Sequence, residues 1–165
     1  DYYDVNFYVA KFNSAGTQQW IKTFGGITFD LLTDIIVSNN IPFVAGSYYN
    51  DTVNTNNTTD FSNAILLGKA STEQWAAFVA KLDPSNGTQL WIKTLGGDGF
   101  MGDNIYSIAA NGSGGVVIGG RFGNDAVNTK NTTDFSNNTL LGRGIDDGFV
   151  ANLDSLGNQQ WIKVI

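Results

Sequence analysis

The chain contains neither cysteine nor histidine among its 165 residues. Without cysteine it has no disulfides and no thiolate metal ligands, so thiols give no indication of the redox compartment. Without histidine it lacks the commonest general base, the usual pH switch and the favoured nitrogen ligand for zinc or copper. Any enzymatic chemistry therefore has to rest on carboxylates.

Charged residues are also scarce, at 15% of the chain against about 25% in a typical globular protein. The net charge is −6, and the nine Lys plus Arg are spread thinly. This pattern excludes a basic stripe for nucleic acid and disfavours anionic membrane surfaces. No apolar run approaches the length of a transmembrane helix, so we expect no membrane insertion. The neutral polar surface of Asn, Thr, Ser, Gln and Gly is typical of an extracellular or cell-surface protein.

An internal repeat organises the sequence. Residues 50–68, NDTVNTNNTTDFSNAILLG, return at 124–142 as NDAVNTKNTTDFSNNTLLG, with 15 of 19 positions identical. A second segment, GTQQWIKTFGG at 16–26, recurs as GTQLWIKTLGG at 87–97 and, shortened, as GNQQWIKVI at 157–165. A fixed period of this length predicts copies of one supersecondary unit, each covering the apolar faces of its neighbours.

Short β-rich runs bounded by Gly, Asn, Asp and Ser fill the chain, so we predict an all-β fold. The expected strands are a leading hairpin of 5–12 and 17–24, then 31–38, 41–49, 75–82 and 88–95, then 104–110, 115–122, 148–153 and 159–165. We assign 1–26 to the C-terminal hairpin of a first repeat, 27–97 to a second and 98–165 to a third, together forming one repeat domain.

Several strands, such as GVVIGGRF, are apolar on both faces, which fits the blades of a propeller better than a sandwich. A series of short motifs follows in a fixed order along the third repeat and the end of the second: Gly96-Gly97, Asp103, 117–122, Asp134-Phe135, Leu140, 147–154 and 157–161. In this order they resemble the β-propeller repeat of bacterial extracellular proteins, the SBBP type. The resemblance implies four-stranded antiparallel blades, here about two and a half open-ended units with stretched connections, whereas a closed ring has roughly four or more.

An open-ended array exposes aromatic and aliphatic side chains at both ends, more than soluble monomers usually leave uncovered. Three arrangements would cover them. The chain is a piece of a longer propeller, or copies close into a ring, or copies join head to tail as a filament. The expected partners are therefore copies of the same chain or further repeats of a longer one.

The connections at 50–68 and 124–142 are more alike than the strands beside them, although loops normally diverge faster. One interpretation is Ca²⁺ binding by hard oxygen ligands, from Asp51, Asp60, Asp125 and Asp134 with Asn54 and Asn128. The alternative is that these residues cap turns while the connection packs onto the blade through Phe61, Leu66, Phe135 and Leu140. No dense calcium-loop spacing is present, which favours the second interpretation and no cofactor.

Seven Asn-x-Ser/Thr motifs are present, an excess over chance for this composition. They mark exposed loops of secreted chains and are candidate glycosylation sites. The acceptors are Asn50, Asn56, Asn57, Asn86, Asn111, Asn131 and Asn137.

Three tryptophans, Trp20, Trp91 and Trp161, are spaced by 71 and 70 residues. They either stack on sugars or pack between blades, and their place in a repeated hairpin favours packing. Lysines recur two positions after each of them, where we expect the side chains to snorkel from the same face, at Lys22, Lys93 and Lys163.

The remaining carboxylate groupings are Asp30 with Asp34 and Asp146 with Asp147. Two acids at a suitable separation hydrolyse glycosides, but nothing in the sequence places either pair in a cleft, so we expect no enzyme. The predicted function is that of an extracellular structural or adhesive repeat protein that self-assembles or belongs to a longer propeller. A carbohydrate- or calcium-binding propeller module is the alternative.

Overall fold

The computed structural model describes residues 5–26, 28–50, 59–61, 64–66, 74–97, 102–123, 133–135, 138–140 and 144–165. All regular elements in these ranges are β-strands, which confirms the predicted all-β class. In chain order the strands are β1 Phe7–Phe12, β2 Gln18–Phe24, β3 Asp30–Ser38, β4 Ile41–Asn50, β5 Thr59–Phe61, β6 Ala64–Leu66, β7 Gln74–Leu82, β8 Gln89–Gly97, β9 Asn104–Ala110, β10 Val116–Gly123, β11 Thr133–Phe135, β12 Asn138–Leu140, β13 Asp146–Leu153 and β14 Gln159–Val164. Within the same ranges no helix has the length and apolarity needed to cross a membrane.

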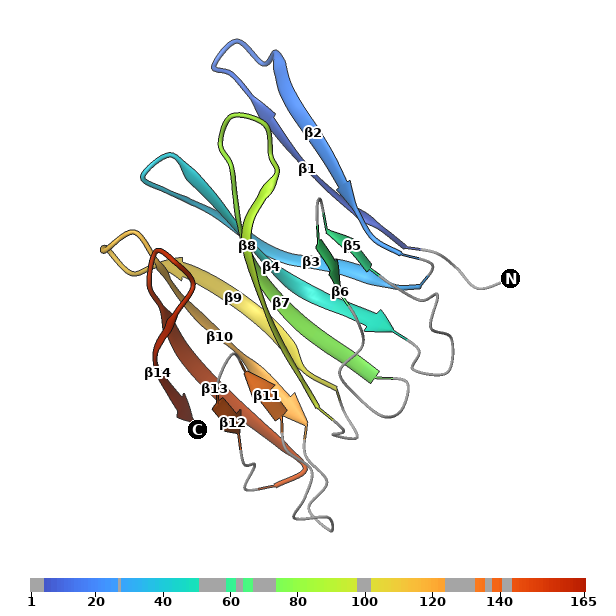
Figure 1. Ribbon diagram of the computed structural model, residues 1–165, viewed down its shortest axis with the longest axis vertical. Coiled ribbons are helices and arrows are strands. Elements are labelled where there is room, and N and C mark those ends of the chain that lie inside the picture. The colour runs from blue at the N-terminus through green and yellow to red at the C-terminus, as the bar shows by residue number, and fades with distance from the viewer. Residues whose placement is uncertain are drawn as a thin grey trace.

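The strands form three successive antiparallel units (Figure 1). We call the hairpin β1–β2 the first unit. The second unit is the meander β3-β4-β7-β8, and the third is the meander β9-β10-β13-β14. The leading hairpin and the four-stranded antiparallel order of both meanders are confirmed, although β11 and β12 extend the sheet of the second unit to six strands. In Figure 1 the three units lie side by side in chain order, and the third unit is farthest from the first.

Local sequence explains the tight turn between β3 and β4. Asn39 and Asn40 both have positive φ, 51° and 63°. A two-residue hairpin loop of this kind needs positive φ at both positions, and Asn tolerates that conformation better than most residues. The strands predicted at 31–38 and 41–49 are therefore joined as expected.

The two long connections each contain a short hairpin that the sequence reading did not predict. These linker hairpins are β5–β6 and β11–β12. β11 pairs with β8 of the preceding unit, with Thr133 opposite Gly97 and Phe135 opposite Leu95. This pairing explains why β8 continues to Gly97 rather than ending at the predicted position 95. β5 also lies close to β2, but it pairs with β6 and forms no ladder with β2 among the described strands. Both connections therefore reach the last strand of the preceding unit, one by strand pairing and the other by contact alone.

The hydrophobic core lies between the units, in two clusters. The first joins the hairpin to the second unit and contains Phe7, Val9, Trp20, Phe24, Val44, Tyr48, Ala76, Phe78, Ala80 and Leu82. The other joins the second unit to the third and contains Phe43, Ala45, Ala77, Val79, Leu95, Ile105, Ile108, Val116, Ile118, Phe122, Phe149, Ala151 and Leu153. Because β4 and β7 contribute to both clusters, the second unit is buried on both faces.

Candidate functional site: the contact repeated between units

Trp20 of the first unit lies under the turn that joins β7 to β8, residues 83–88. Its indole Nε1 donates a hydrogen bond of 3.1 Å to the carbonyl oxygen of Pro84. Lys11 Nζ, from the strand paired with Trp20, donates to the same oxygen at 2.8 Å. One backbone carbonyl of the second unit thus accepts two side-chain donors from the first.

The same contact is built again between the second and third units. Trp91 Nε1 donates to the carbonyl oxygen of Ser155 at 3.1 Å, and Lys81 Nζ donates to it at 3.0 Å. Ser155 lies in the turn joining β13 to β14, residues 154–158. The two contacts match in donors, acceptor position and distance, so the chain uses one interface design twice.

Each of these turns presses a glycine against the tryptophan ring. Gly87 has φ of +76°, and a Cβ placed on it would lie 2.6 Å from Trp20 Cε3. Gly157 has φ of +79°, and its Cβ would lie 2.9 Å from Trp91 Cδ2. Glycine is therefore required twice over, for the left-handed backbone and for the close approach of the ring.

A carboxylate at the first position of each turn organises it. Asp83 Oδ1 accepts from Ser85 N at 2.7 Å, and Asp154 Oδ1 accepts from Asn158 N at 2.8 Å. The Ser85 hydroxyl and backbone N–H lower the pKa of Asp83, and the Asn158 backbone N–H lowers the pKa of Asp154. These side chains hold the turn in shape, as Asp commonly does in such loops.

Hydrogen bonds between strands extend the contact between the second and third units. The Thr33 hydroxyl donates to the Ile105 carbonyl at 2.8 Å, and Asp34 Oδ2 accepts from Ile108 N at 3.0 Å. The Ser47 hydroxyl also donates to Asn104 Oδ1 at 2.9 Å. The carboxylate of Asp34 is therefore part of the inter-unit contact.

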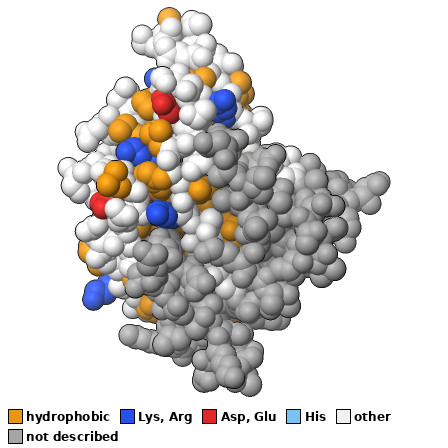
Figure 2. All heavy atoms as spheres, in the orientation of Figure 1, with side chains coloured by type: hydrophobic (Ala, Val, Ile, Leu, Met, Phe, Trp, Pro, Cys, Tyr) orange, Lys and Arg blue, Asp and Glu red, His pale blue; other side chains and the backbone are white. Residues whose placement is uncertain are grey.

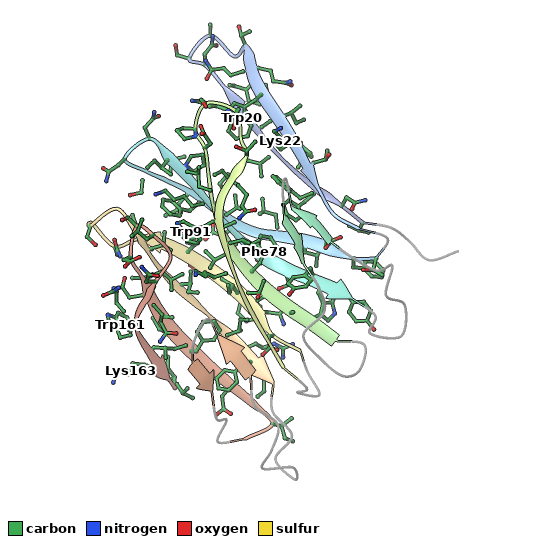
Figure 3. The ribbon with its side chains drawn as sticks, in the orientation of Figure 1. Trp20, Lys22, Phe78, Trp91, Trp161 and Lys163 are labelled. Carbon is green, nitrogen blue, oxygen red and sulfur yellow. The ribbon has the colours of Figure 1, made fainter. Side chains whose placement is uncertain are left out.

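The third tryptophan has a different environment. Trp161 is 43% exposed, whereas Trp20 is 9% exposed. Figure 3 shows the three tryptophans in succession along one side of the molecule, with Trp161 at its outer edge. Among the described residues, no turn lies on Trp161 as the other two turns lie on Trp20 and Trp91.

The calcium candidates fall largely outside the described residues. Asp60 lies in β5 and Asp134 in β11, and only the backbone of these two residues is described. The remaining candidates lie outside the described residues, namely Asp51, Asn54, Asp125 and Asn128. The structure therefore leaves the calcium hypothesis as a prediction. Among the described residues, no three His, Cys, Asp or Glu side chains come together as a metal site would require.

Two of the seven glycosylation candidates have described side chains. Asn86 is exposed, and its amide oxygen accepts from the Thr88 N–H at 2.8 Å and from the Thr88 hydroxyl at 2.7 Å. Asn111 Nδ2 instead donates to Asn152 Oδ1 at 2.8 Å and to the Leu153 carbonyl at 3.0 Å. A glycan on Asn111 would displace one of these bonds, so Asn86 is the better acceptor of the two. At Asn50, the last residue of β4, only the backbone is described. The other candidates lie outside the described residues, namely Asn56, Asn57, Asn131 and Asn137.

The other carboxylates have structural contacts. Asp30 is fully buried, and its Oδ2 accepts from Gly26 N at 2.8 Å. Asp146 Oδ2 pairs with Arg121 Nη1 at 2.7 Å, and Asp147 Oδ2 accepts from Gly144 N at 3.1 Å. The Asp146–Asp147 and Asp30–Asp34 groupings are therefore parts of turns, strand pairs and unit contacts.

Tyr48 is the buried titratable group at the centre of the second unit. Burial raises the pKa of its hydroxyl strongly, the hydrogen bond with Thr94 lowers it in part, and the charges of Asp103 and Asp30 raise it further. The hydroxyl is therefore neutral throughout the physiological range and serves as a polar link within the core.

Sequence reasoning missed the acceptors of the repeated contact, because a backbone carbonyl has no sequence signature. The signal that could have indicated the contact is the glycine within each turn, which stands at a constant spacing before the tryptophan of the next strand. The packing of Trp75 has no sequence signature either, because its ring meets the edge of Tyr49, with ring centroids 5.5 Å apart. Phe29 lies on the same indole at 6.4 Å.

Comparison of the sequence with protein-family models finds no match, and neither does comparison with curated proteins.

Proposed function

We propose that this chain is an extracellular or cell-surface repeat protein with a structural or adhesive role, built from units of the SBBP-type propeller repeat. The observation that carries the proposal is the tryptophan–lysine contact to a turn carbonyl, made once to Pro84 and once to Ser155. A contact that recurs with the same donors and distances suits a protein whose task is to extend by adding units.

The distribution of charge supports a structural role. The described carboxylates are engaged in turns and unit contacts, as for Asp34 with Ile108 and Asp83 with Ser85. Figure 2 shows hydrophobic side chains spread over the described part of one face, with Lys, Arg and Asp or Glu side chains and polar surface among them. Such a face suits contact with another protein surface better than a reaction on a small molecule.

The mass and shape of the native particle test the proposal. We expect electron microscopy and light scattering of native material to show rings, filaments or a larger repeat array. A compact, monodisperse particle with the mass of one chain would contradict the assembling role.

A second function, carbohydrate binding, is favoured by one observation, the exposure of Trp161. An aromatic ring open to solvent can stack on the apolar face of a sugar. Quenching of tryptophan fluorescence by a glycan panel, lost in Trp161→Ala, would support this function. Thermal unfolding with and without calcium tests the calcium-binding module, which a calcium-dependent rise in melting temperature would support.

A further inference from the structure

The outer face of the first unit carries apolar side chains at positions that are buried elsewhere in the repeat. Tyr8 and Phe12 are 65% and 56% exposed. Their equivalents in the second unit, Phe78 and Leu82, are fully buried against the first unit. The first unit thus presents the same face that the second unit uses for docking.

The outer face of the third unit carries the opposite half of this interface. Trp161 and Ile165 are 43% and 73% exposed. In the first unit the equivalent pair is Trp20 and Phe24, which are 9% and 1% exposed because the second unit covers them. The two ends of the molecule therefore present complementary halves of a contact that is already made twice inside it.

The turn between β1 and β2, residues 13–17, has the geometry of the two docked turns. Asn13 Oδ1 accepts from Thr17 N at 2.8 Å, as Asp154 Oδ1 accepts from Asn158 N. Gly16 has φ of +77°, but a Cβ placed on it would meet nothing within 4 Å. The carbonyl of Ser14 stands where Pro84 and Ser155 stand in the other turns. This turn therefore has the shape that receives a tryptophan, without a ring against it.

We propose that a second copy of this chain docks its first unit on the outer face of the third unit, head to tail. The Trp161 ring of one copy packs on Gly16 of the other, and its Nε1 donates to the Ser14 carbonyl. Tyr8 and Phe12 then cover the apolar surface beside Trp161. This inference rests on the proposed function and names the surfaces through which it would operate. The contact is heterologous, so it continues from copy to copy into a filament or a ring.

One difference sets the strength of the contact. The position that Lys11 occupies in the first unit and Lys81 in the second is occupied by Asn152 in the third. The Oδ1 of Asn152 accepts from Asn111 Nδ2 at 2.8 Å. The contact between copies therefore has one donor to the turn carbonyl instead of two. The docking first unit is also a hairpin rather than a four-stranded sheet, so it buries less surface. We expect reversible association that depends on protein concentration.

Sedimentation velocity of the 165-residue chain over a concentration series tests the contact. We expect the wild-type chain to associate and Trp161→Ala to weaken the association roughly 30-fold, the effect of removing an aromatic anchor from an interface. The matched control is Tyr106→Ala, which removes an aromatic side chain of similar exposure, 55%, from β9. It should associate like the wild type. A wild-type chain that stays monomeric up to millimolar concentration would overturn the proposal.

The opposite surface is tested by Gly16→Asn. Asn tolerates positive φ better than most residues and the site has open space, so the variant should fold with the circular dichroism of the wild type and only a slightly lower melting temperature. Its side chain would occupy the place of the incoming Trp161 ring, and we expect association to fall by at least tenfold. Association equal to the wild type in a folded variant would overturn the assignment of this turn.

Mixing the two variants gives the sharpest result. Trp161→Ala keeps an intact first unit, and Gly16→Asn keeps an intact third unit, so together they can form one good contact and no more. We expect the mixture to form dimers but no larger species. If single variants still build wild-type assemblies, the proposed function stands and this contact is wrong. If the wild type forms no assembly, both fail.

Discussion

The second and third units have the same strand order and related sequences, but their outward faces differ in exposure. Val79 and Leu95 of the second unit are fully buried, because the third unit packs on them. Of their equivalents in the third unit, Val150 is half-buried and Ile165 is 73% exposed. The comparison teaches that burial in this fold is conferred by the neighbouring unit, and that the same residue pattern is core in one unit and surface in the next.

The largest expected effect separates a covered position from its uncovered equivalent. Phe78 is fully buried and stacks on Phe7 of the first unit, with centroids 5.6 Å apart. Phe78→Ala should lower the free energy of unfolding by about 3–5 kcal/mol, since it leaves a cavity between units. Tyr8→Ala, the same position in the first unit, should change it by about 0.5 kcal/mol or less. Urea denaturation measures both. Equal losses would show that the two faces are equally buried in solution.

A smaller effect distinguishes the docked turns from the free one. Gly87→Ala combines the strain of a left-handed Ala with a clash against the Trp20 ring, and should cost roughly 2–4 kcal/mol. Gly16→Ala carries the backbone strain alone, about 1–2 kcal/mol. Gly112 is the matched control, with φ of +78° and nothing within 4 Å of its added Cβ. Thermal unfolding of the three variants checks the order, and a Gly87 variant as stable as the Gly16 variant would contradict the close ring contact.

The sequence predicted much of this fold because its local signals agree with the tertiary structure. The Asn39-Asn40 turn, Gly87 and the apolar runs of β4 and β10 each indicate one conformation, and the strands lie within two residues of prediction. The sequence did not predict that the linker hairpins would contact the last strand of the preceding unit. A three-residue strand such as β11 has no periodicity to detect, and it forms because the β8 edge offers backbone partners at Leu95–Gly97.

The candidate site was less predictable than the fold. The spacing of the tryptophans indicated a repeated packing role, but a sequence does not say which backbone carbonyl an indole will meet. Asp34 illustrates the same limit, since its carboxylate accepts from Ile108 N, on a strand more than seventy residues away. Candidate chemistry that depends on long-range contacts of this kind needs coordinates.

The smallest expected effect concerns pH and compares the three turns directly. The lowered pKa values of Asp83 and Asp154 mean that their contribution to stability is complete above the pKa of the unfolded chain. It is lost as the pH falls through the folded values. Stability should therefore decline toward acid pH. Both carboxylates are exposed to solvent, so the change should be smaller than those above.

The first turn supplies the control, because Asn13 occupies the same position and forms the same bonds to Ala15 N and Thr17 N without a titrating group. The double variant Asp83→Asn and Asp154→Asn should keep the hydrogen bonds to the turn backbone and lose part of the acid dependence. Urea midpoints measured from neutral to acid pH compare the double variant with the wild type. An unchanged acid slope in the double variant would show that these two turns do not contribute to it.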